Sequence, residues 1–236
     1  MQTHEKTKIS GGLSHFSTMR RKEKGSKKGG GIKVIMPKSN DINLQKIDNK
    51  STEILELEGD LYGMGVKIIV VYFDANKNRK GNEANDKIRQ DVEKLIENNE
   101  QEALMVLGDF NGHLKILDGR ENDRNGRMIM EWVESYGLVI LNLDEKCKGT
   151  YTWSRGDSKT AIDYILVNDN FYKIFEKMEI DENKDWFADS DHHLVSGFFR
   201  VDRRGGSNYN NRNRWKTGEY FRKDEEALIN FRRELE

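Results

Sequence analysis

The feature that most constrains this chain is a short apolar run that ends abruptly in polar residues. Residues 103–107 are all apolar, and Gly108, Asp109 and Asn111 follow almost at once. A run of this length that ends at a glycine predicts a buried strand rather than a helix. Asp109 and Asn111 lie two positions apart, so both side chains leave an extended chain on the same side. They are either a pair of reactive groups or the residues of an ordinary turn, which Asp and Asn also favour.

Two later stretches supply groups that suit a shared site. Asp163 lies inside residues 161–167, an otherwise apolar run that predicts a strand. An unpaired buried carboxylate costs roughly several kcal/mol, so we expect Asp163 to face a cationic side chain or to lie at a sheet edge. Asp191 and His192 lie in a polar stretch that leads into a strand predicted at 194–199. A lone His is more often a surface or core residue, but here a carboxylate and an imidazole can satisfy each other.

These stretches belong to an ordered set of motifs. The set consists of Val70-Val71-Tyr72, Gly108-Asp109-Phe110-Asn111, Thr150-Tyr151-Thr152-Trp153, Ile162-Asp163-Tyr164-Ile165 and Ser190-Asp191-His192. In order and spacing it closely resembles the successive motifs of the endonuclease/exonuclease/phosphatase superfamily. The residues of the third and fourth motifs are most similar to those of the apurinic-type endonuclease domain of LINE-type (non-LTR) retrotransposons and of craniofacial development protein 2-like chains.

The resemblance implies a fold and a domain organisation. The expected fold is α+β, a four-layer α/β/β/α sandwich of two mostly antiparallel sheets like that of deoxyribonuclease I. We expect this domain to cover residues 1–203, with its first strand missing from the N-terminus. Residues 204–236 are expected to form a linker and an amphipathic helix that leads towards an absent reverse transcriptase, as in LINE-type elements.

The resemblance also implies a metal cofactor, Mg²⁺ or Mn²⁺. The expected ligands are Asp191, Asp109 and the residue at position 2, where relatives carry a Glu. This sequence has Gln2 there. A Gln offers one neutral carbonyl oxygen, whereas Mg²⁺ prefers carboxylate oxygens. The sequence therefore predicts a metal site with a weakened ligand set.

The catalytic roles implied by the resemblance fall on five residues. Asp109 would orient or deprotonate the attacking water, and Asn111 would hold water and phosphate in line. His192, paired with Asp163, would transfer a proton or place positive charge on the phosphate. Tyr72 would donate a hydrogen bond to a phosphate oxygen.

Hydrophobic periodicity predicts the elements between the motifs. Residues 85–100 carry apolar side chains at helical spacing, and a second helix is predicted to end at a cap formed by Gly137. The remaining strands are predicted at 32–37, at 54–58 paired with 66–73 across a turn at 59–65, at 138–141 and around 151–154. His193 and the single Cys147 are assigned no role.

Charge is distributed unevenly along the chain. The net charge is −1, but residues 1–38 carry ten Lys or Arg against two acids and residues 203–236 carry nine against six, so the middle is strongly acidic. Acidic residues gather divalent cations, and basic flanks can track phosphates, although residues 20–28 are equally typical of a solvated loop. The resemblance to retrotransposon endonucleases implies DNA as a partner. No apolar run approaches the roughly 18 residues that a membrane span requires, and no secretory signal is present. We expect an intracellular chain of the nucleus or cytoplasm, of unknown oligomeric state.

Three functions follow from these observations. The first is Mg²⁺-dependent hydrolysis of DNA phosphodiester bonds, as in retrotransposon endonucleases. The second is a phosphatase of the same fold that acts on lipids, nucleotides or small phosphates. The third is an inactive remnant that binds nucleic acid, which Gln2 and the missing first strand favour.

Overall fold

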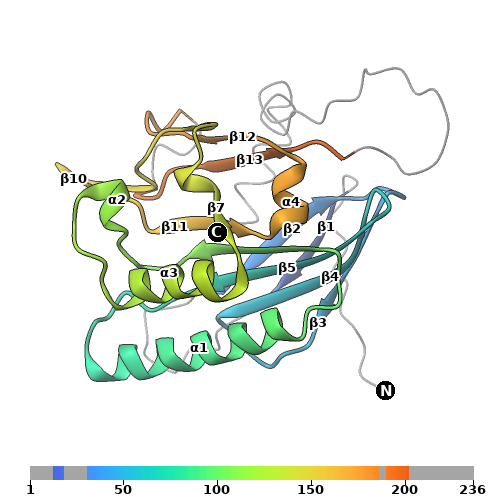
Figure 1. The fold of residues 1–236 in the computed structure, drawn as a ribbon, viewed down its shortest axis with the longest axis horizontal. Helices are drawn as coiled ribbons and strands as arrows, with labels where there is room; N and C mark the ends of the chain where they lie inside the picture. Colours follow the sequence, from blue (N-terminus) through green and yellow to red (C-terminus); the bar gives the residue numbers. More distant parts are fainter. Residues whose placement is uncertain (1–12, 19–30, 186–189, 202–236) are drawn as a thin grey trace. The chain divides into compact units, whose positions relative to one another are not determined.

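The computed structural model describes residues 13–18, 31–185 and 190–201 (Figure 1). The chain divides into two units, Met1–Asp202 and Arg203–Glu236, and the described residues all belong to the first. The predictions for Gln2, for a missing first strand and for the segment 204–236 fall outside the described residues. The predicted domain boundary at 203 stays a prediction.

A six-stranded sheet forms the centre of the first unit, with strand order β3-β4-β5-β6-β11-β7. Its strands are β3 (Ile42–Ile47), β4 (Ile54–Leu61), β5 (Met64–Tyr72), β6 (Ala103–Asp109), β11 (Asp163–Val167) and β7 (Val139–Ile140). The β5–β6 pair is parallel and the other neighbours are antiparallel. The strand predicted from the apolar run at 103–107 is therefore confirmed as β6, and it lies inside the sheet.

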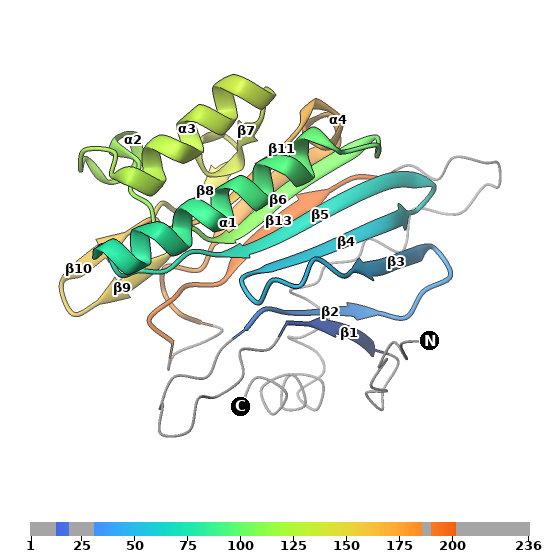
Figure 2. The ribbon, with the colours of Figure 1, turned by 90° about the horizontal axis from the view of Figure 1, so that it is seen from below.

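Two long helices lie side by side over one face of this sheet (Figures 1 and 2). They are α1 (Arg79–Glu97) and α3 (Arg124–Tyr136). The start predicted for α1, residue 85, is wrong by six positions because Asn78 caps the helix and accepts the N–H of Gly81. The residues between 79 and 85 lack the apolar spacing that marks the rest of α1. The C-terminal cap of α3 is confirmed, since Gly137 adopts the left-handed conformation with φ 63°.

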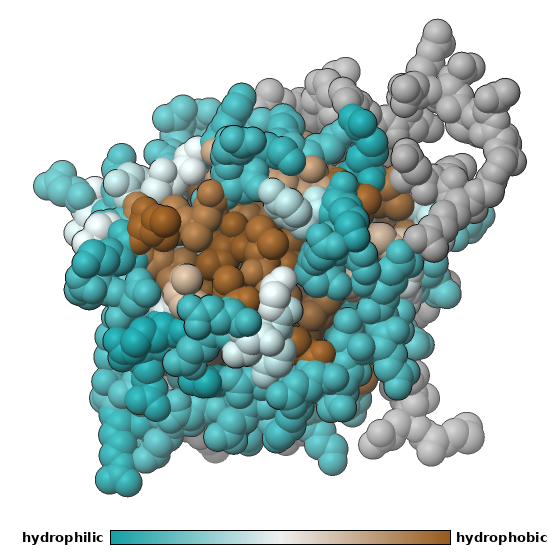
Figure 3. Space-filling model, viewed as in Figure 1, coloured by the Kyte–Doolittle hydropathy of each residue, from teal (hydrophilic) through white to brown (hydrophobic). Residues whose placement is uncertain are grey.

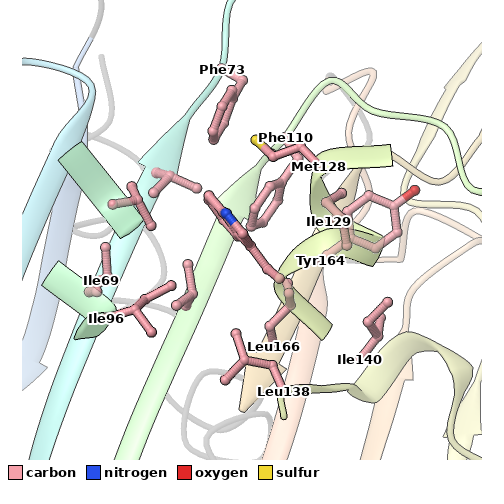
Figure 4. Packing of buried hydrophobic residues seen from close by; sticks show 14 of the residues in the cluster. Ile69, Phe73, Ile96, Phe110, Met128, Ile129, Leu138, Ile140, Tyr164 and Leu166 are labelled. Carbon is pink, nitrogen blue, oxygen red and sulfur yellow. The ribbon is translucent and has the colours of Figure 1, made fainter. Parts of the chain in front are cut away.

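Aromatic side chains fill the space between the helices and the ends of β5 and β6 (Figure 4). The rings of Phe73 and Phe110 stack with centroids 5.6 Å apart, and Trp132 of α3 meets both edge-on. Phe110 also meets Tyr164 of β11 edge-on at 5.8 Å. Phe73 follows β5 directly and Phe110 follows β6, so this packing fixes the positions at which the two strands end.

Smaller sheets pack against the opposite face of the six-stranded sheet through a second hydrophobic cluster. One is the pair β1 (Leu13–Ser17) and β2 (Lys33–Pro37), and another is the three-stranded β13-β12-β8, formed by Val195–Phe199, Phe175–Ile180 and Cys147–Lys148. A separate hairpin joins β9 (Trp153–Arg155) to β10 (Ser158–Thr160). The short helices are α2 (Lys115–Asp118), α4 (Asp169–Lys173) and the 3₁₀ helix η1 (Leu141–Leu143). This arrangement confirms the predicted α+β sandwich.

The hairpin between β4 and β5 is tighter than predicted. A turn was expected at 59–65, but the strands continue to Leu61 and Met64. Tyr62 and Gly63 make the turn, with φ values of 56° and 85°. The carboxylate of Asp60 accepts the N–H of Gly63 at 2.7 Å, which stabilises the turn. A glycine at the second turn position is the signal for such a hairpin.

A buried lysine lies beneath the C-terminal end of α1. The ammonium of Lys67 on β5 is 2.8 Å from the carboxylate of Glu58 and 3.4 Å from that of Glu56, both on β4. It also donates to the carbonyl of Leu95 in α1 at 3.2 Å. The side chains of Lys67 and Glu56 are each only 4% exposed. This group therefore links the helix to the sheet through two buried charges, Lys67 and Glu56, and the partly exposed Glu58.

Hydrophobic side chains gather on the face that Figure 1 turns to the viewer, in the region of α2, α3 and β7 (Figure 3). Leu117, Met130 and Val133 are partly buried there and pack against the core. Ile116 of α2 is 75% exposed. None of the helices in the described residues is long and apolar enough to cross a membrane.

Candidate active site

Three polar residues meet where neighbouring strands of the central sheet end. In the parallel pairing of β5 and β6, Tyr72 is the partner of Asp109. In the antiparallel pairing of β6 and β11, Asp109 is the partner of Asp163. The apolar residues of each strand fix this register, because a shift by one residue would turn them away from the core. The sequence therefore places Tyr72, Asp109 and Asp163 side by side.

His192 approaches this strand end from a separate segment. Its Nδ1 lies 3.0 Å and 3.2 Å from the two carboxylate oxygens of Asp163. The backbone of His192 forms an isolated bridge with Trp153 of β9. The expected pairing between a strand carboxylate and a loop imidazole is present. The hydrogen bond to Asp163 raises the pKa of His192 and so favours its charged form near neutral pH.

Asp109 lies at the centre of the group. One ligand atom from each of Asp109, Asp163 and His192 lies within 4.8 Å of the others. Burial, and next the neighbouring charge of Asp163, raise the pKa of Asp109 to about 7. A carboxylate with a pKa near neutrality can both accept and release a proton under physiological conditions.

Asn111 is held in an unusual backbone conformation beside Asp109. Its φ is 45°, in the left-handed region, and its backbone N–H donates to the carboxylate of Asp109 at 2.9 Å. The side-chain amide donates to the carbonyl of Phe73 at 2.8 Å. Asn125, buried at the start of α3, donates to the carbonyl of Phe110 at 2.8 Å. These bonds hold the loop after β6 against the loop after β5.

The structure brings five of the predicted site residues together and leaves Asp191 apart from the Asp109 carboxylate. The structure brings together Tyr72, Asp109, Asn111, Asp163 and His192. Asp191 directly precedes His192 but is exposed, and its carboxylate is not part of the Asp109 group. Gln2 lies outside the described residues, so its assignment as a metal ligand stays a prediction.

Sequence reasoning missed a second polar group beside the loop after β6. The hydroxyl of Thr160 donates to the carboxylate of Asp118 at 2.7 Å, and Nδ1 of His113 lies 2.9 Å from Thr160 Oγ1 and 3.1 Å from Asp118 Oδ2. These residues are up to 47 positions apart in the sequence. The available signal was His113, two positions after the Asp109 motif. The group ties that loop to the β9–β10 hairpin.

A family model described as endonuclease-reverse transcriptase matches residues 66–196, more than half of the chain and all of the described motif residues. The chain belongs to the endonuclease/exonuclease/phosphatase superfamily. The predicted resemblance, including that to retrotransposon endonucleases, is confirmed. No curated protein matches the chain.

Solved structures of the superfamily share the fold. The endonuclease domain of TRAS1, a telomere-specific non-LTR retrotransposon, is 17% identical with a TM-score of 0.59, over 80% of this chain and 81% of that one. The 3′ phosphatase NExo from Neisseria, bound to a product DNA hairpin, is 17% identical with a TM-score of 0.59, over 80% of each chain. The AP endonuclease LMAP from Leishmania major is 13% identical with a TM-score of 0.62, over 81% of this chain and 71% of that one.

The raised pKa of Asp109 predicts that this superfamily member loses stability as the pH rises. In the unfolded chain an Asp titrates near pH 4, about three units below the folded value. Between about pH 4 and 7 the folded protein therefore binds the extra proton, and the free energy of unfolding falls as the pH rises. We expect Asp109→Asn to raise Tm by roughly 5 °C at pH 8 without divalent cations, and hardly at all at pH 4. Calorimetry at both pH values measures this, and equal Tm values at pH 8 would contradict it.

Proposed function

We propose that this chain is a divalent-cation-dependent nuclease that hydrolyses phosphodiester bonds in DNA, of the retrotransposon endonuclease type. The observation that carries the proposal is the Asp109, Asp163 and His192 group at the open end of the central sheet. DNA is proposed as the substrate because one structural neighbour is the endonuclease domain of a telomere-specific retrotransposon and another was solved with a DNA hairpin.

The residues present fit a divalent cation. The carboxylates of Asp109 and Asp163 lie together in this group, and carboxylate oxygens suit Mg²⁺ and Mn²⁺, whereas His192 in its charged form would act as a hydrogen-bond donor. Asp109 would hold the ion, and Asp191 is proposed as a further ligand from the neighbouring segment. A bound cation would polarise the scissile phosphate and offset the charge that develops on it.

The protein groups around the ion supply proton transfer and orientation. Asp109, in its ionised form, would accept a proton from the attacking water. Asn111 would orient that water, since its loop is fixed by backbone hydrogen bonds. His192, whose charged form the contact with Asp163 favours, would donate to a phosphate oxygen, and Tyr72 would add a second hydrogen bond.

Cleavage of supercoiled plasmid tests the proposal. We expect the purified chain to nick plasmid DNA with Mg²⁺ or Mn²⁺ and to stop when EDTA removes the cation. The double variant Asp109→Ala, His192→Ala should be inactive, while Asp91→Ala on exposed α1 surface should match wild type. A variant with Gln2→Glu, assayed in parallel, tests the predicted metal position and should cleave faster. Nicking that survives in the double variant would overturn the proposal.

A second candidate function is removal of a terminal phosphate from DNA. It is favoured because a neighbour of the same fold is a 3′ phosphatase. A labelled oligonucleotide with a 3′ phosphate separates the two activities. Release of phosphate without cleavage of the chain would favour the phosphatase, and cation-independent binding without either reaction would favour the inactive remnant.

A further inference from the structure

A second histidine directly follows His192, and its side chain is buried. His193 is 7% exposed, and its Nε2 lies 2.8 Å from the hydroxyl oxygen of Ser154 on β9. Because successive side chains of an extended segment point to opposite sides, His193 faces Ser154 while His192 faces Asp163. The two neighbouring imidazoles therefore make different contacts, His193 with Ser154 and His192 with Asp163.

Backbone hydrogen bonds lock the same segment to β9. The N–H of His193 donates to the carbonyl of Thr152 at 2.7 Å, and the N–H of Ser154 donates to the carbonyl of Asp191 at 2.8 Å. The side-chain bond between Ser154 and His193 lies within this pairing. The position of His192 along β9 is thus set by contacts on both sides of it in the sequence.

The β9–β10 hairpin contacts the other two reactive segments as well. The hydroxyl of Thr152 accepts the backbone N–H of Asp163 at 3.0 Å. At the same end of the hairpin, Thr160 of β10 contacts His113 in the loop that follows Asn111. The hairpin, together with Thr152 directly before β9, is therefore hydrogen-bonded to each of the three segments that carry Asn111, Asp163 and His192.

The imidazole of His193 has a feature that packing alone does not explain. Its Nδ1 is buried and has no hydrogen-bond partner among the described residues. A buried polar atom without a partner costs free energy that an apolar side chain of the same size would avoid. The bond from Nε2 to Ser154 is thus the property that distinguishes His193 from a Leu at this position.

We propose that His193 is a positioning residue, which together with Ser154 seats the Asp191–His192 segment on the β9–β10 hairpin so that His192 meets Asp163. The catalytic part of this inference rests on the proposed nuclease function. The positional part concerns the geometry of His192 and does not depend on which reaction the site performs.

Three variants separate positioning from packing. His193→Leu keeps the volume and removes the bond to Ser154, His193→Gln offers an amide that can reach the same hydroxyl, and Ser154→Ala removes the partner. Ser158→Ala, on an exposed position of the same hairpin, is the matched control. For each variant, Tm, kcat and KM on plasmid DNA are measured together with the NMR ring resonances of His192.

We expect His193→Leu to leave Tm unchanged or higher, to lower kcat roughly 10- to 100-fold with little change in KM, and to shift the ring resonances of His192. Ser154→Ala should have a similar effect, and the double variant should be no worse than either single one. His193→Gln should restore both kcat and the resonances, and Ser158→Ala should match wild type.

The two readouts keep this inference distinct from the proposed function. If wild type does not cleave DNA, the nuclease proposal fails, but the His192 resonances still decide whether His193 positions that ring. Unchanged resonances in a folded His193→Leu variant would overturn the inference even if DNA cleavage is confirmed. A loss of kcat that follows Tm and is not restored by His193→Gln would also overturn it.

Discussion

Asp109→Asn is expected to lower kcat for DNA cleavage by about a thousandfold or more, the range typical of losing a general base. The substitution preserves the shape of the side chain and its hydrogen bond from the backbone of Asn111, but removes the group that accepts a proton. The pKa of Asp109 is about 7 in the absence of a cation, and a bound cation would lower it because positive charge favours the ionised carboxylate, so the wild-type rate should rise with pH below this value. The variant should lose this rise as well as the rate.

Single-turnover cleavage of a labelled duplex between pH 5.5 and 9 measures both effects. Asp91→Asn on α1 provides the control, since the Asp91 side chain is 40% exposed and lies in a surface pair with Lys94. The same Asp109→Asn protein is expected to be more stable than wild type at high pH, so unfolding would not account for its inactivity. A variant that retains a tenth or more of the wild-type rate, as a rough threshold, would exclude Asp109 as the base.

Lys67→Met is expected to destabilise the fold by about 3–5 kcal/mol, the usual cost of removing one partner of a buried ion pair. The side chain of Glu56 is 4% exposed, and Lys67→Met removes the cation that pairs with its charge beneath α1. The bond from Lys67 to the carbonyl of Leu95 is lost as well. Tm should fall by roughly 10 °C.

Chemical denaturation of Lys67→Met and of a matched surface variant measures this loss. Lys94→Met is the control, because Lys94 is 66% exposed and its ion pair should contribute about 1 kcal/mol or less. Adding Glu56→Leu to Lys67→Met should recover much of the stability, since the buried charge is then removed. Equal stability of Lys67→Met and wild type would show that Glu56 is neutralised in another way.

The sequence predicted elements with strong hydrophobic patterns and missed those without them. β6, β11 and α3 follow from an apolar run or from helical spacing. β3 was not predicted because its sequence, Ile-Asn-Leu-Gln-Lys-Ile, mixes polar residues into an edge strand that water reaches. α4 has only five residues, and its start depends on the cap that Asn168 provides.

For the candidate site, the motif residues were predictable and their supports were not. Asp109, Asp163 and His192 were predictable because carboxylates and imidazoles are residue types that transfer protons and bind cations. Asn125 and Ser154 support the site through hydrogen bonds to segments distant in the sequence, and only the tertiary packing determines those partners. The close contact of Gly126 with the loop after β6 was equally unpredictable. A Cβ at this position would lie 1.9 Å from the carbonyl oxygen of His113.

The register of β6 against β11 bears on how such a site can change over evolutionary time. Asp109 and Asp163 are ladder partners, so the backbone of the sheet sets the separation between them. Loops around the open end of the sheet can then lengthen, shorten or change composition while these two carboxylates keep their spacing. The carboxylate pair and the choice of target can therefore change independently. A lineage can acquire a new nucleic-acid target through its loops and retain Asp109 and Asp163.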